Sequence, residues 1–324
     1  MSQAQDLATL SQLFSARAVP FRNRIINGDH RVNQRGGGAT VVDSYSYVVD
    51  RWYVAANGAA VTANNNGGAV GAAAQSLVAN GAAGNTNVSI GQRIESRNIQ
   101  DLAGQKVTLS GYLYATQALQ PVLTLNTPTA QDNFASMNVV AGPALPLIVP
   151  NAWNYFRVTA TLAASASNGL QVDFSSGGAV GAGVSYAIGA IQLEAGENLN
   201  PGFEIIPFSE SLARCQRYFF SSYPVGSFVG ANDIVNAMRG IAMDANNIVM
   251  FNRLPVPMRV APSVSIFNPS NGTANQARNS ASGAAAGITG VNPSALAGAY
   301  SLTSSGGFTA GNPYDFHIYA SAEL

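Results

Sequence analysis

Apolar and polar residues alternate along most of the chain from about Asn23 to Glu194, a pattern typical of β-strands. The alternating segments are short, and turns rich in Gly, Asn and Ala separate them. We expect strands at Thr40–Val49, Ser76–Ala79, Val88–Glu95, Lys106–Thr116, Gln120–Thr127, Trp153–Leu162, Leu170–Ser175 and Ser185–Glu194. So many strands without interleaved helices predict an antiparallel jelly-roll β-sandwich, which we place at residues 23–207.

The period changes from two to about 3.6 residues in the stretch Pro201–Phe219. Its apolar residues recur at helical spacing and form one stripe: Phe208, Leu212, Cys215 and Phe219. Ser209 stands where an N-cap is expected. Because so short a helix is marginal in water, we expect its stripe to be buried.

We interpret residues 208–219 as a joint helix between two β domains. Leu212 and Cys215 lie on the inward stripe and are expected to anchor the joint. Arg214 and Arg217 lie off the stripe, so we expect them to be free to pair across a subunit boundary.

The strand pattern resumes after the joint and predicts a second, smaller β-sandwich at residues 220–324. Ile241–Met243 and Ile248–Phe251 flank a polar turn and predict a hairpin. Three prolines in Leu254–Pro262 indicate an edge or a connector. We expect the alternating segment Tyr314–Tyr319 to close this second sandwich.

The first 22 residues carry a helical pattern of their own, with an apolar stripe that includes Leu7, Leu10, Leu13 and Phe14. Such a helix either packs on the first domain or docks the protein onto a larger assembly. We assign residues 1–22 to docking.

Charge is scarce and balanced. Charged residues make up 10% of the chain, against about 25% in an average soluble domain. The sixteen basic residues are dispersed, which argues against nucleic-acid binding. No apolar run reaches the roughly 20 residues of a membrane span, and the first residues do not resemble a secretory signal. Cys215 is the sole cysteine, so no intrachain disulfide is expected.

Residues suited to catalysis or metal binding are few. The chain has two histidines, His30 and His317, in different predicted domains, and it lacks hydrolase, zinc-protease and P-loop motifs. We therefore expect no enzyme activity and no metal site built on Cys and His. The carboxylates in predicted strands are Asp50, Glu95, Asp173 and Glu194. They suit either glycoside cleavage or, as we favour, pairing with nearby arginines such as Arg51, Arg93 or Arg157.

Aromatic residues give a stronger indication. Tyr112 and Tyr114 alternate on one face of a predicted strand, and Trp153 and Tyr155 do so on another. Sugars stack their apolar C–H faces on such rings beside a few polar groups. The alternative for these four residues is a place in the core or at a subunit contact.

Several segments in a fixed order resemble a group of tailed-phage virion proteins. In the first part they are NRIINGD (residues 23–29), VDRW (49–52), IGQRIE (90–95), LAGQKVTLSGYL (102–113) and WNYFRVTAT (153–161). Further along they are IGAIQLEAG (188–196), FEIIPFSESLARCQRYF (203–219), LPVPMRVAPSVSIFN (254–268) and YDFHIYASAEL (314–324). The order of these segments, more than any one of them, carries the resemblance.

The resemblance implies a virion appendage with a jelly-roll domain similar to carbohydrate-binding modules. Members are tail fibre or receptor-binding proteins, or capsid spikes and decoration proteins. The resemblance implies a homotrimer, made in the host cytoplasm, that contacts other virion proteins and either binds host-surface glycan or simply decorates the shell. Its relatives often hold a structural calcium, but Gly189 stands where their aspartate is expected. Asn27, Asp29 and Glu194 offer oxygens, yet we predict no metal or cofactor. The alternatives are a glycan-degrading tailspike-like enzyme and a free carbohydrate-binding lectin.

Overall fold

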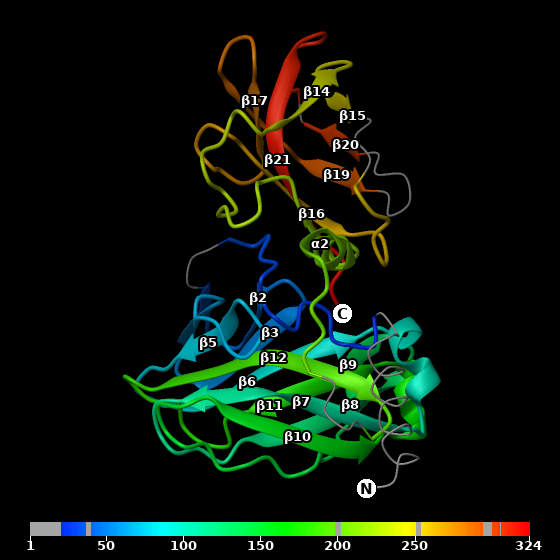
Figure 1. Cartoon of the computed structure of the whole chain (residues 1–324). Helices are drawn as coiled ribbons and strands as arrows, with labels where there is room; N and C mark the ends of the chain where they lie inside the picture. Colours follow the sequence, from blue (N-terminus) through cyan, green and yellow to red (C-terminus); the bar gives the residue numbers. More distant parts are fainter. Residues whose placement is uncertain (1–20, 37–39, 198–201, 251–253, 294–299, 305) are drawn as a thin grey trace, which may run out of the picture.

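The computed structural model describes residues 21–36, 40–197, 202–250, 254–293, 300–304 and 306–324. The docking residues Leu7, Leu10, Leu13 and Phe14 lie outside these ranges. Figure 1 shows a larger and a smaller lobe, with helix α2 (Phe208–Gln216) between them. Strands dominate the described ranges and pair antiparallel, so the fold is all-β as predicted. None of the helices there has the length and apolar composition that crossing a bilayer requires.

The larger lobe is a sandwich of two six-stranded antiparallel sheets (Figure 1). Sheet 1 has the order β1 (Thr40–Val42), β4 (Val61–Asn64), β5 (Ser76–Asn80), β12 (Ser185–Ala195), β7 (Lys106–Ala115) and β10 (Asn154–Thr161). Sheet 2 has the order β2 (Tyr45–Val49), β3 (Trp52–Gly58), β6 (Asn85–Ile94), β11 (Leu170–Ser175), β8 (Val122–Ala130) and β9 (Asn133–Asn138). Three short 3-10 helices complete the lobe: η1 (Ser96–Asn98), η2 (Gln100–Leu102) and η3 (Ala164–Asn168).

One hydrophobic core fills the space between these two sheets. The alternation along β7 decides which residues enter it: Leu109 and Leu113 point inward and are buried. Phe174 of sheet 2 joins the same cluster. Ser110 and Tyr112 of β7 face away from the core, and this outer face of sheet 1 carries the site described below.

Two details of the predicted strands are wrong. The stretch Thr40–Val49 forms two strands, because the chain bends after β1 and enters sheet 2 as β2. The segment after Asn23 forms turns instead of a strand. Asn27 has a φ of 57°, and its side chain exchanges hydrogen bonds of 2.9 and 3.0 Å with the backbone of Val32. That exchange satisfies backbone groups that a strand ladder would otherwise pair.

The smaller lobe is organised around its last strand, β21 (Pro313–Ser321). The main path runs β18 (Ala285–Gly287), β17 (Gln276–Asn279), β21, β14 (Met238–Ala242), β15 (Asn247–Met250), β20 (Tyr300–Thr303) and β19 (Gly290–Pro293). The other half of β21 pairs with β13 (Phe219–Ser221) and β16 (Ser263–Phe267). The predicted hairpin is confirmed as β14–β15. Strand β21, which we expected to close this sandwich, lies in the middle of it and pairs with four strands.

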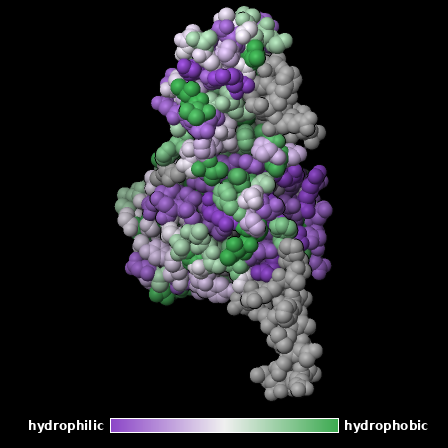
Figure 2. All heavy atoms as spheres, turned by 45° about the horizontal axis from the view of Figure 1, so that its top comes forward, coloured by the Kyte–Doolittle hydropathy of each residue, from purple (hydrophilic) through white to green (hydrophobic). Residues whose placement is uncertain are grey.

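The surface agrees with the low charge of the sequence. On the face in Figure 2, apolar residues form separate patches among polar ones instead of one continuous apolar area. Isolated apolar residues of this kind are normal on soluble proteins and indicate no particular partner.

Candidate functional site

The outer face of sheet 1 gathers aromatic and polar side chains from three adjacent strands. On β7 the outward residues are Thr108, Ser110, Tyr112 and Tyr114. The register of β10 sets Tyr155 opposite Tyr112 and Arg157 opposite Ser110. On the other side of β7, strand β12 sets Gln192 opposite Ser110 and Glu194 opposite Thr108.

The four aromatic residues predicted to bind sugar come together here as two pairs. The rings of Tyr112 and Tyr155 lie 5.2 Å apart at 59°, and those of Tyr114 and Trp153 lie 5.3 Å apart at 47°. Tyr155 is 47% exposed, although the opposite face of the same strand buries Phe156 in the core. Tyr155 is therefore not a core residue, whereas Tyr112 and Trp153 are partly buried against the small cluster of Val70, Ala73 and Ala190.

A groove of about 230 Å³ lies on this face. Its lining residues are Ala72, Thr108, Ser110, Tyr112, Tyr155, Arg157, Ala190, Gln192, Glu194, Gly202 and Phe203. The volume lies below the roughly 300–1,000 Å³ of sites that enclose a drug-sized ligand. The groove therefore suits a short stretch of an extended ligand that lies across the sheet.

One wall of the groove comes from the loop between β4 and β5, whose residues are mostly small or polar. Val70 is buried against Ala190, and its backbone exchanges hydrogen bonds of 3.1 and 3.0 Å with Ala73. Gly189 permits this packing, because a Cβ there would overlap the Val70 side chain. Gly189, where the resemblance would place a calcium-binding aspartate, is thus the strand position covered by the loop between β4 and β5.

The polar groups at one end of the groove are already engaged. Glu194 pairs with Arg22, and burial raises the pKa of Glu194 despite that pairing. The Gln192 side chain donates to the carbonyl of Gly202 at 3.1 Å and accepts from the Glu204 amide at 2.6 Å. This end of the groove is consequently rigid, and the segment after β12 is fixed to the sheet.

The described residues contain no group of three His, Cys, Asp or Glu side chains that would hold a metal ion. The oxygens considered for calcium are used elsewhere: Asn27 bonds Val32, and Asp29 pairs with Arg31 at 2.8 Å. No cation site is built from them.

The remaining candidate catalytic groups have structural roles. His30 is fully buried against Trp52, with ring centroids 4.8 Å apart, and burial lowers its pKa to about 3. The His317 ring lies 2.9 Å from the Ser222 hydroxyl and 2.7 Å from the carbonyl of Asp233. Burial raises the pKa of the Cys215 thiol, which keeps it protonated.

The strand carboxylates do not have the arginine partners that we expected. Both oxygens of Asp50 accept hydrogen bonds from Gln34, at 2.6 and 2.7 Å. Glu95 pairs with Arg217, and Glu194 with Arg22. These pairings join segments that are distant in the sequence, so local spacing gave no signal for them.

The joint helix begins at Phe208, so Ser209 lies inside it and is not the N-cap. Cys215 is fully buried in a small apolar cluster, with Leu212 packed against it. Arg217 makes a bidentate contact of 2.8 and 3.1 Å with Glu95, and Arg214 lies 3.1 Å from Glu210. Both arginines are therefore engaged within the chain.

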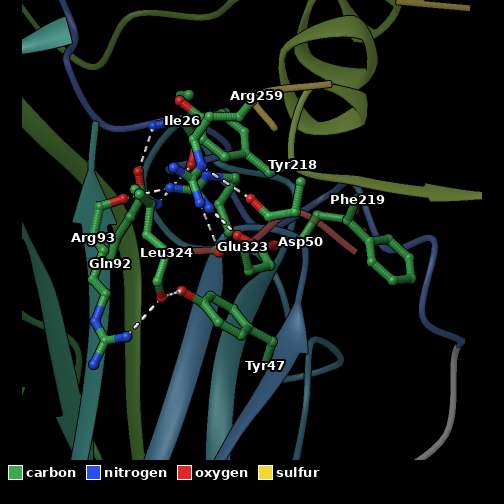
Figure 3. Close-up of polar contacts among 12 residues, drawn as sticks. Ile26, Tyr47, Asp50, Gln92, Arg93, Tyr218, Phe219, Arg259, Glu323 and Leu324 are labelled. Atoms are coloured by element: carbon green, nitrogen blue, oxygen red, sulfur yellow. Dashed lines mark hydrogen bonds and ion pairs between the residues drawn. The ribbon is translucent and has the colours of Figure 1, made fainter. Parts of the chain in front are cut away.

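A second set of contacts across the joint comes from the end of the chain (Figure 3). Glu323 pairs with Arg51 and, at 2.7 Å, with Arg35. The Arg51 guanidinium also stacks on the ring of Tyr218, 3.6 Å from its centroid. The sequence analysis missed this cluster, because nothing in the local pattern relates Glu323 to residues some 270 positions earlier.

The main chain of Leu324 is held as well. Its oxygen accepts hydrogen bonds from Tyr47 at 3.0 Å and from Arg93 at 2.6 Å (Figure 3). Strand β21 thus continues from the core of the smaller lobe directly into contact with sheet 2.

No family model matches the sequence, and no curated protein matches it. Structural neighbours are mostly carbohydrate-binding modules. The CBM22-1 xylan-binding domain of Paenibacillus barcinonensis Xyn10C has 14% identity and a TM-score of 0.32, over 51% of this chain and 98% of that chain. The C-terminal family 22 module of Clostridium thermocellum Xyn10B has 13% identity and a TM-score of 0.34, over 51% and 98%.

A phage protein is also among the neighbours. The enzymatically active domain of bacteriophage CBA120 tailspike protein 4 has 15% identity and a TM-score of 0.33, over 55% of this chain but 22% of that chain. At such TM-scores these similarities carry no argument about function, so the proposal below rests on the groove.

Proposed function

We propose that this protein is a non-enzymatic glycan-binding appendage of a bacteriophage particle. The observation that supports binding is the groove on sheet 1, where an exposed ring lies beside polar groups held in place by the strand register. The Tyr155 ring offers a sugar an apolar face, and Tyr112 supports that ring from the next strand. Ser110 lies one strand repeat from Tyr112 and offers a hydroxyl.

Rigid positioning favours binding, because the protein then loses little entropy when it captures a sugar. The rings stand on β7 and β10, which pair through eight consecutive residue positions, from Asn154–Leu113 to Thr161–Lys106. Saccharide hydroxyls also need partners that do not move. Ser110 meets that requirement, at an end of the groove that Gln192 and Glu194 fix through their contacts with Glu204 and Arg22.

A glycan-degrading enzyme is the second candidate, and the lining of the groove disfavours it. Hydrolysis of glycosides generally uses two carboxyl groups that flank the scissile bond. Among the described lining residues Glu194 is the single carboxylate, and Arg22 occupies it. We expect no reducing sugar to be released from host polysaccharide, and its release would favour the enzyme.

The place on a phage particle, the homotrimer and the contact with other virion proteins rest on the ordered sequence segments. A tail fibre and a capsid spike fit them equally. Native mass spectrometry of the isolated protein at micromolar concentration should give the mass of three chains per complex. The mass of a single chain would contradict the trimer. Labelling the C-terminus and imaging virions would then place the protein on the tail or on the capsid.

The binding proposal is tested on a glycan array with two matched variants. Tyr155→Ala removes the exposed ring of the groove and should abolish binding to the glycans that the wild type retains. Tyr45→Ala removes a ring of similar exposure, 40%, from the outer face of sheet 2 and should leave binding unchanged. Equal loss in both variants, or no loss in Tyr155→Ala, would contradict a site on sheet 1.

A further inference from the structure

Arg157 differs from every other arginine or lysine that the structure describes. Ten of these arginines and the lysine lie within 4.0 Å of a carboxylate. Arg93 and Arg259 instead donate to main-chain oxygens near the end of the chain. Within the described ranges Arg157 makes no ion pair, hydrogen bond or cation–π contact, and it is exposed.

The unpaired cation lies in the groove, in the row of side chains that crosses the sheet next to the aromatic pair. Its neighbours in that row are Ser110 and, beyond it, Gln192, and neither carries charge. Glu194 is the acidic group of the described lining, and it pairs with Arg22. The charge of Arg157 is therefore not neutralised from within the groove.

Arg157 also stands at a useful distance from the stacking ring. Tyr155 and Arg157 point the same way from β10, one strand repeat of about 6.7 Å apart. A sugar stacked on Tyr155 would direct a substituent toward the guanidinium, which binds planar anions through two parallel N–H donors.

We infer that the groove is selective for acidic glycans, whose carboxylate or sulfate group pairs with Arg157. This inference rests on the proposed glycan-binding function and names the ligand class of the same site. The neutral part of the ligand lies on the tyrosines, and the anionic substituent decides which glycans are retained. Because Arg157 has no partner within the described residues, a ligand can bind it without breaking any contact of the fold.

Two pairs of probes that differ in charge alone test this selectivity. The first pair is an oligogalacturonate and its fully methyl-esterified form of equal length, and the second is dextran sulfate and dextran. We expect the wild type to bind the acidic member at least about tenfold more tightly, as one charge-assisted bidentate contact allows.

The two pairs also distinguish the anionic group. Preference for the acidic member in the first pair alone assigns a carboxylate as the ligand group, and preference in both pairs assigns anions in general. The preference should weaken as salt rises from about 0.05 to about 0.5 M, because the Debye length falls about threefold over that range.

Arg157→Gln should remove the preference for the acidic member while leaving the affinity for the neutral member unchanged. The matched control is Arg97→Gln, which removes an arginine whose side chain is 74% exposed and lies 3.9 Å from Glu95. It should retain the preference.

The outcomes separate this inference from the proposed function. If neutral glycans bind as tightly as acidic ones and Tyr155→Ala abolishes both, glycan binding stands and acidic selectivity is overturned. If Arg157→Gln keeps the preference, the selectivity is not due to this residue and the inference is overturned. If neither member of either pair nor any array glycan binds, both proposals fail.

Discussion

Replacing Glu323 by glutamine tests whether the end of the chain holds the two lobes together. The Arg51 side chain is 1% exposed, and Glu323 and the Tyr218 ring are its close partners. Burial lowers the pKa of Arg51, but Glu323 together with Tyr218, Tyr47 and Cys215 outweighs this effect, so the net pKa is raised. Glutamine keeps the shape of Glu323 and removes its charge, which leaves a buried guanidinium without a counter-ion.

The expected cost is about 3 kcal/mol of unfolding free energy, at the lower end of the 3–5 kcal/mol typical of a buried pair that loses one partner. For a chain of 324 residues that corresponds to a fall in Tm of about 4–5 °C. Differential scanning calorimetry of the wild type and the variant measures it. The smaller lobe loses its anchor on sheet 2, so we also expect its transition to separate from that of the larger lobe.

Glu197→Gln is the matched control. Glu197 pairs with Lys106 at the surface, where the two side chains are 63% and 59% exposed. Such a pair contributes about 0–1 kcal/mol, so the control should melt close to the wild type.

A double variant completes the test. Arg51→Met in the Glu323→Gln background removes the orphaned charge, so it should recover part of the lost stability. Equal melting of Glu323→Gln and Glu197→Gln, or further loss in the double variant, would refute the reasoning.

Three other perturbations have defined outcomes. Burial raises the pKa of Asp173 from 3.8 to about 7. Between these two pH values the folded state keeps Asp173 protonated and the unfolded state does not. The free energy of unfolding therefore falls as pH rises from about 4 to about 7, by up to about 1.4 kcal/mol per pH unit. Asp173→Asn should flatten that fall in urea unfolding between pH 4 and 8, and an unchanged slope would exclude Asp173 as its source. Gly189→Val should displace Val70, cost about 1–3 kcal/mol by overpacking and weaken glycan binding, whereas full binding would show that the loop is not needed. Leu212→Asp places a charge in the joint cluster and should lower Tm and uncouple the lobes, and unchanged melting and assembly would contradict its anchoring role.

The aromatic part of the candidate site could be predicted from the sequence because it depends on local alternation. Tyr112 and Tyr114 share a face whatever the strand pairs with, and so do Trp153 and Tyr155. The polar half of the groove could not be predicted. Gln192 and Glu194 reach it through the register of β12 with β7, which shifts at a bulge after Gly189.

The packing of the loop between β4 and β5, which forms one wall of the groove, could not be predicted for a related reason. Its sequence is small and polar, so it predicts no packing of its own. It packs because Gly189, on a strand more than 110 residues later, leaves room for Val70.

The sequence by itself determined the all-β class, most strands of the larger lobe and the helix at the joint, because each depends on periodicity over a few neighbouring residues. Tertiary structure alone decided which charges meet. Arg217 turns inward to Glu95, and Arg51 is buried under Glu323. Arg157 is left without a partner in the described structure. Charge pairing acts between residues that are close in space but distant in the chain, and no local pattern records that proximity.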